Sequence, residues 1–224
     1  MDFATLKQKS KADIKGKIGV LFVISLILGL ISAGAGALSS IIPVVGPIIS
    51  VLITPAFTLS LIRVFLMVVR SEEVQVSDAF CGFKDFWGAF KVLFLTGLYT
   101  FLWSLLFVIP GIIKTFAYSL AMYIYSDNPE MGANDCISRS KEWTDGYKAK
   151  IFLYSLYYSL LFFLGAFTLG IAYIWIIPYT NAHFANLYEE IKAKNLPPKA
   201  EEAPKAEEAP KTEEAPAEET PKAE

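Results

Sequence analysis

Two basic side chains interrupt long apolar stretches, where a charge is costly. Arg63 lies within the run Pro47 to Val69, and Lys114 follows the dipeptide Pro110-Gly111. A cation at membrane depth either extends its stem to the interface or holds an anionic group. We favour extension to the interface for both residues. The other reading makes them a basic pair that faces the bundle interior and holds an anionic lipid or peptide group.

Polar side chains near these cations define two faces of predicted membrane helices. Lys114 and Tyr118 share one helical stripe. In the last apolar run, Tyr179 and His183 begin a second stripe that continues at helical spacing to Glu190. Such faces are expected to point into protein rather than lipid. The candidate ligand-binding residues are therefore Lys114, Tyr118, Arg63, Tyr179 and His183, although the second stripe also fits a helix that emerges into the cytoplasm.

The sequence offers no recognisable catalytic or metal-binding set. His183 is the only histidine, and Cys81 and Cys136 are too few and too far apart for a disulfide framework or a zinc site. All thirteen acidic residues before the tail, from Asp2 to Glu190, lie in polar segments or at the end of an apolar run. We therefore expect no enzyme activity, no cofactor, no metal and no nucleic-acid partner.

Hydropathy predicts an all-α polytopic membrane bundle. The composition is 54% apolar, and a run of about 20 apolar residues can cross the hydrocarbon core. Two runs contain turn signals at their centres, Pro110-Gly111 and the pair Gly165 and Gly170, so each is divided into a hairpin. The six predicted spans are Ile18 to Leu38, Pro47 to Val69, Val92 to Ile109, Ile112 to Tyr125, and the two halves of Ile151 to about Tyr188.

Charge supports six spans in preference to four. The polar segments contain five, three, four and two Lys or Arg residues before the tail repeats, whereas the turns Ser39 to Gly46, Pro110-Gly111 and Gly165 to Gly170 contain none. The positive-inside rule then places both termini in the cytoplasm. A cleaved signal ending near Ala33-Gly34-Ala35 is the alternative reading of the start, and we prefer a retained helix.

Three polar segments are predicted to form amphipathic helices at the membrane surface. The first is residues 1–17, with Phe3, Leu6, Ser10 and Ile14 on one face. The second begins near Ser77. The third begins after Asn128-Pro129 or after Gly132 and ends at Gly146. Residues 18–191 form the membrane domain. Residues 192–224 form an acidic Pro-Lys-Ala-Glu repeat tail, with nine Glu and four Lys from Pro198 onward, which is predicted to be disordered.

The sequence resembles a bacterial integral-membrane family catalogued as domain of unknown function 975. The resemblance is carried by the stretch Phe101 to Lys114, by Asp127-Asn128-Pro129, by Gly146-Tyr147-Lys148 and by Ile177-Pro178-Tyr179. It implies a multi-span protein, mostly of Gram-positive bacteria, and a distant similarity to membrane domains attached to some glycerophosphodiester phosphodiesterases. Those membrane domains are not the catalytic part, so the resemblance transfers no site.

Three functions follow from these observations. We favour a non-enzymatic bundle of the cell membrane that binds membrane lipids, anionic lipids among them, or another membrane protein. A transporter or pore for a small or anionic solute is the alternative, and a membrane enzyme acting on lipid is the third. A cavity joining Lys114 to the polar face of the sixth span would favour transport, and a tightly filled interior would favour the first function.

Overall fold

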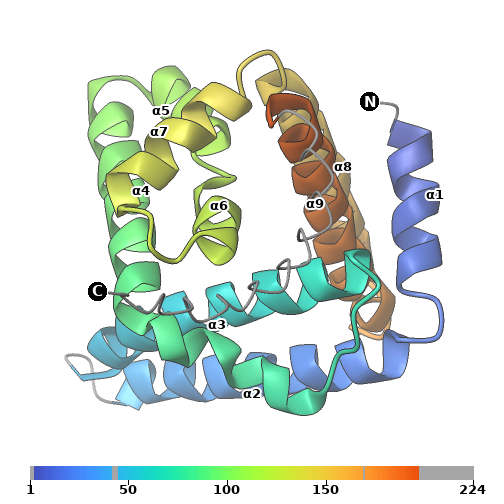
Figure 1. The fold of residues 1–224 in the computed structure, drawn as a ribbon. Helices are drawn as coiled ribbons and strands as arrows, with labels where there is room; N and C mark the ends of the chain where they lie inside the picture. The colour runs from blue at the N-terminus through green and yellow to red at the C-terminus, as the bar shows by residue number, and fades with distance from the viewer. Residues whose placement is uncertain (1–2, 42–44, 169, 197–224) are drawn as a thin grey trace, which may run out of the picture.

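The computed structural model describes residues 3–41, 45–168 and 170–196. It is all-α, as predicted (Figure 1). The predicted disordered tail lies outside these residues from position 197 onward, and part of the predicted turn at Ser39 to Gly46 does too. The elements are α1 (Phe3–Asp13), α2 (Ile18–Ile41), α3 (Val45–Val69), the 3-10 helix η1 (Val76–Asp85), α4 (Phe86–Leu106), α5 (Val108–Ala117), α6 (Ala121–Asp127), α7 (Ala133–Trp143), α8 (Lys148–Ala166) and α9 (Tyr173–Asn195).

Four helical stretches are long and apolar enough to cross a membrane: Ile48–Val69, Val76–Leu106, Val108–Asp127 and Lys148–Ala166. A fifth candidate combines α1 with the start of α2, which meet at an angle of 93°. The α9 helix is not among the candidates, and its C-terminal half carries glutamate and lysine side chains. The described residues therefore contain four to five candidate spans, and the six-span arrangement is not shown.

The chain reverses direction within the third apolar run, as predicted, but at Phe107 rather than at Pro110. Phe107 is extended (φ −155°, ψ 142°), and Pro110 lies in the first turn of α5. A helix running through this point would bring the proline ring against the carbonyl of Leu106, whereas the first turn of a new helix tolerates proline. The reversal is tight, because a Cβ atom on Gly111 would lie 2.8 Å from the Cα atom of Ser104. The α4 and α5 helices therefore form a close hairpin.

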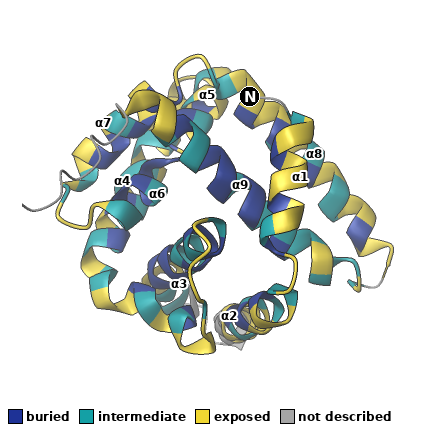
Figure 2. Cartoon of the chain, turned by 45° about the vertical axis from the view of Figure 1, so that its right-hand side comes forward, coloured by how far each residue is buried: buried dark blue, intermediate teal, exposed yellow. Residues whose placement is uncertain are grey.

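The helix α3 is the centre of the fold and contacts α2, η1, α4, α6 and α9. Its closest partner is η1, whose Gly82 N–H donates to the Ser60 hydroxyl at 2.9 Å. A Cβ atom at position 82 would lie 2.2 Å from the carbonyl oxygen of Ala56, so glycine is needed for this approach. Figure 2 shows buried residues concentrated on α3 and α9 and exposed residues on the outward faces. The core thus lies where the hairpins meet.

The helix reversals point away from one another. In Figure 1 the α4–α5 reversal lies at the top left, the α8–α9 connection at the lower right, and the end of α2 with the start of α3 at the lower left. The tips of the α4–α5 and α8–α9 reversals have exposed apolar side chains: Ile109 is 72% exposed and Phe167 75%. The molecule is therefore a set of splayed hairpins rather than a parallel bundle.

The three predicted amphipathic segments are helical, but they differ from the prediction in what they contact or in where they begin and end. The α1 helix turns its buried residues Leu6 and Ser10 to protein, mainly α9, so that face is not free to lie on lipid. The η1 helix is capped by Gln75 rather than Ser77, with Asp78 completing a capping box. The α7 helix follows its N-cap Gly132, one of the two predicted starts, and ends at Trp143, three residues before the predicted end at Gly146.

Candidate functional site

A cavity of about 440 Å³ lies between α3, α4, α5–α6 and α9. Its polar lining consists of hydroxyl and amide groups, and none of its lining residues is charged. The polar members are Thr58, Thr96, Thr100, Thr115, Ser119 and Asn181, together with Tyr118 and Tyr123. The apolar members include Leu61, Leu93 and Met122. The lining of the cavity is therefore uncharged and has both polar and apolar side chains, and the cavity lies among the apolar helices of the fold.

Three of the donors in this cavity are used by carbonyl groups close to them in the chain. Thr115 donates to the Gly111 carbonyl at 3.0 Å, Ser119 donates to Phe116 at 2.8 Å, and the Asn181 amide donates to Ile177 at 2.9 Å. Hydroxyl and amide oxygens can still accept hydrogen bonds. The buried Thr96 hydroxyl has no hydrogen-bond partner among the described residues. A neutral ligand with hydroxyl donors matches this chemistry.

An apolar groove adjoins the cavity. The groove, of about 360 Å³, lies between α2 and α9 and is lined by Phe22, Leu26 and Ile174. A smaller cavity of about 210 Å³ shares Ser25, Gly29 and Ile177 with the groove, and it shares Thr58 and Leu61 with the larger cavity. The small cavity therefore lies between the other two spaces, with the hydroxyl-lined cavity on one side and the apolar groove on the other.

The predicted candidate residues do not form one site. Tyr118 lines the 440 Å³ cavity, but Lys114, Arg63, Tyr179 and His183 do not. Arg63 pairs with Asp85 at 2.5 Å and donates to the Cys81 carbonyl at 3.2 Å, so its charge is neutralised within the protein. The structure thus gives Arg63 partners in η1, away from those of Lys114.

Lys114 lies close to the polar segment that contains Lys141 and Lys148. Its ammonium lies 4.6 Å from the ring centroid of Trp103, a cation–π contact within the α4–α5 hairpin. Lys141 of α7 and Lys148 of α8 are close enough to act on it electrostatically. The prediction had placed Lys114 on the opposite side of the membrane from these two lysines. Hydropathy gives the length of an apolar run but not the direction in which it packs, so it could not predict this proximity.

His183 is enclosed by aromatic rings. It is fully buried, and its ring lies 5.1 Å from Tyr154, 5.2 Å from Tyr158 and 5.4 Å from Phe3. Neither of its ring nitrogens has a hydrogen-bond partner among the described residues. His183 therefore packs as a neutral ring.

The polar stripe that begins at Tyr179 is covered by α1. The Tyr179 hydroxyl donates to the Lys7 carbonyl at 3.4 Å, and the Asn186 amide donates to Asp13 at 2.8 Å. Helical spacing predicted that this face points into protein, but it could not identify α1 as the cover.

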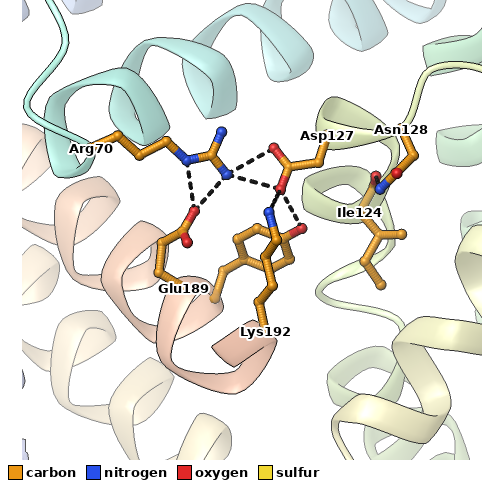
Figure 3. Close-up of polar contacts among 7 residues, drawn as sticks. Arg70, Ile124, Asp127, Asn128, Glu189 and Lys192 are labelled. Atoms are coloured by element: carbon orange, nitrogen blue, oxygen red, sulfur yellow. Dashed lines mark hydrogen bonds and ion pairs between the residues drawn. The ribbon is translucent and has the colours of Figure 1, made fainter. Parts of the chain in front are cut away.

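A charged network not predicted from the sequence joins three helix ends (Figure 3). Asp127, at the end of α6, accepts from Arg70 at 2.9 Å, from Lys192 at 2.5 Å and from the Tyr188 hydroxyl at 2.8 Å. Arg70, directly after α3, also pairs with Glu189 of α9 at 2.6 Å. Burial alone would lower the pKa of the Arg70 guanidinium, but its hydrogen bonds to the two carboxylates raise that pKa. The two cations, Arg70 and Lys192, are balanced by the carboxylates of Asp127 and Glu189. Because these residues belong to or directly follow α3, α6 and α9, the network holds the three helices together.

Comparison with known proteins identifies a family. The family model described as Protein of unknown function (DUF975) matches residues 1–114 and 105–195. No curated protein and no solved structure matches the chain. Within the described residues, no group of three His, Cys, Asp or Glu side chains is placed to hold a metal ion.

Proposed function

This chain belongs to the family described as Protein of unknown function (DUF975), and from its own geometry we propose that it is a non-enzymatic membrane protein that binds membrane lipid between its helices. One observation carries the proposal: a neutral, hydroxyl-lined cavity is linked to an apolar groove through a small cavity that shares lining residues with both. A lipid has the same division into polar head and apolar tail. The uncharged lining favours a neutral head with hydroxyl groups, such as that of a diacylglycerol, over a phosphate.

We also propose a position in the cell membrane with both termini in the cytoplasm and the apolar hairpins inserted into the bilayer. The network of Arg70, Asp127, Glu189 and Lys192 supports this arrangement, because it joins the charged ends of three helices at one place. The exposed tips, by contrast, carry uncharged side chains. Charged side chains favour water, and uncharged apolar tips favour lipid.

Transport of a small solute remains the second candidate. Thr115 and Ser119 line the same cavity as Asn181 of α9. The cavity thus links polar side chains of two apolar runs, which is part of the path that a transported solute would need. Lys114 does not line this cavity. A neutral solute therefore fits this alternative better than an anionic one.

The proposal is tested by purifying the full chain in native nanodiscs and measuring the retained lipids by mass spectrometry. Thr96→Val keeps the side-chain shape but removes the unpartnered hydroxyl, so retention of neutral hydroxyl-bearing lipid should fall about three- to tenfold. Gly29→Leu should fill the groove, because a Cβ atom there meets open space. The matched control is Gly34→Leu, which also meets open space but does not line the groove. Equal lipid retention in wild type, Thr96→Val and Gly29→Leu would refute the proposal.

A further inference from the structure

The α4–α5 hairpin carries an apolar tip next to a charged helix. Residues 92–113 are uncharged, and the tip residues Leu105, Phe107, Val108 and Ile109 are each at least 67% exposed. The described part of the protein covers at most about a third of the surface of each of these side chains. Such a surface needs an apolar partner.

The α7 helix fixes how deep this tip can lie. Asn134 of α7 accepts a hydrogen bond from Tyr99 of α4 at 3.0 Å, and Ser140 and Thr144 donate to the carbonyl of Ala117, at the end of α5. The polar side of α7 presents Asp135, Lys141 and Glu142 to solvent. Three exposed charges on one short helix keep it at the water or headgroup level.

Distances along the hairpin then limit the depth of its tip. Phe107 is eight residues beyond Tyr99, about 12 Å along a helix, and ten residues before Ala117, about 15 Å. The hydrocarbon core of a bilayer is about 30 Å thick. Since both α7 contacts lie at the surface, the tip reaches at most about the middle of the bilayer.

The basic residues lie where this geometry places the lipid phosphates. Lys114 is seven residues from Phe107, about 10 Å above the tip. It lies over Trp103, a residue type that favours the membrane interface, and near Lys141 and Lys148. Asp145 pairs with Lys148 at 2.7 Å. Lys114 and residues 132–150 together have five basic and three acidic side chains, so the net charge here is positive. The charge therefore complements an anionic leaflet.

We infer that the α4–α5 hairpin is a re-entrant wedge: it enters the cytoplasmic leaflet, ends within the hydrocarbon, and leaves on the side from which it came. Its occupant is the lipid of that leaflet, with acyl chains around Phe107 to Ile109 and anionic phosphates near Lys114 and Lys141. The wedge keeps both termini on the same side and replaces two of the six predicted crossings. It does not depend on lipid binding in the internal cavity.

Cysteine labelling of the full chain tests the wedge. In a background with Cys81→Ala and Cys136→Ala, Ile109→Cys is compared with Thr168→Cys at the α8–α9 connection and Ser138→Cys on the exposed side of α7. An impermeant maleimide should label Thr168→Cys in intact cells and Ser138→Cys only after permeabilisation. It should label Ile109→Cys in neither case, at less than about a tenth of the Thr168→Cys level, because a thiol in hydrocarbon stays protonated and out of reach. Labelling of Ile109→Cys in intact cells at the Thr168→Cys level would overturn the inference.

A second measurement distinguishes lipid from protein around the tip. A fluorophore attached at Ile109→Cys, in vesicles with anionic lipid, should be quenched more by nitroxides on the acyl chains than by nitroxides on the headgroups. Quenching that is insensitive to both nitroxides would show that a second copy or another protein covers the tip, and it would overturn the assignment to the leaflet.

Discussion

Replacing Asp127 by asparagine tests the network that joins α3, α6 and α9. The Asp127 side chain is 9% exposed and accepts from Arg70, Lys192 and Tyr188. Asp127→Asn removes the negative charge, keeps the size, and turns an amide group toward two cations. We expect the variant to unfold more easily, because Lys192 loses its carboxylate partner in a partly buried place.

The magnitude follows from the exposure of the three groups. Breaking a buried ion pair by removing one partner costs about 3–5 kcal/mol. Arg70 and Lys192 are 33% and 28% exposed, so water screens part of the loss, and Arg70 keeps Glu189. We therefore expect Asp127→Asn to lower the free energy of unfolding by about 2–3 kcal/mol. Tyr188→Phe, which removes one hydrogen bond, should cost about 1 kcal/mol.

The assay is reversible unfolding in mixed detergent micelles, followed by circular dichroism. Asp145→Asn is the control, because this carboxylate pairs with Lys148 but is 79% exposed, and its loss should leave stability unchanged. If Asp127→Asn were as stable as Asp145→Asn, the network would not hold the helices together. Tyr188→Phe keeps the test informative if Asp127→Asn fails to accumulate.

Two further predictions concern a close helix contact and a buried thiol. Gly111→Ala should destabilise the protein by about 1–3 kcal/mol, because its Cβ atom would lie 2.8 Å from Ser104 Cα. The control Gly97→Ala places its Cβ atom in open space and should be neutral or slightly stabilising. Equal unfolding curves for the two variants would contradict the tight hairpin. Burial raises the pKa of the Cys136 thiol to about 11, so about one thiol in a thousand is ionised at pH 8. Iodoacetamide should therefore alkylate Cys136 far more slowly than a cysteine placed at the exposed Ser138. Similar alkylation rates would mean that Cys136 is not buried as described.

Local features of the fold could be predicted from the sequence. The break near Pro110 follows from proline stereochemistry, and the bounds of α7 follow from Gly132 and Gly146. Each of these signals lies within a few residues of the feature it determines.

Contacts between distant segments could not be predicted in the same way. Arg70 meets Asp127 and Glu189 across 57 and 119 residues of chain, and the α1 helix covers α9 across more than 170. The approach of Lys114 to Lys141 and Lys148 could not be predicted, because an apolar run can cross a membrane or turn back within it. Neither composition nor periodicity distinguishes these outcomes, since both describe a segment and not its neighbours.

Photo-crosslinking tests lipid binding between the helices most directly. A diacylglycerol with a photoreactive tail is incorporated into nanodiscs with the full chain, and crosslinked peptides are mapped by mass spectrometry. We predict crosslinks concentrated on Phe22, Leu26 and Ile174 in the groove, reduced by Gly29→Leu but not by Gly34→Leu. Crosslinks that instead spread over outward-facing residues such as Leu156 and Leu160, and that do not respond to Gly29→Leu, would contradict the proposed function.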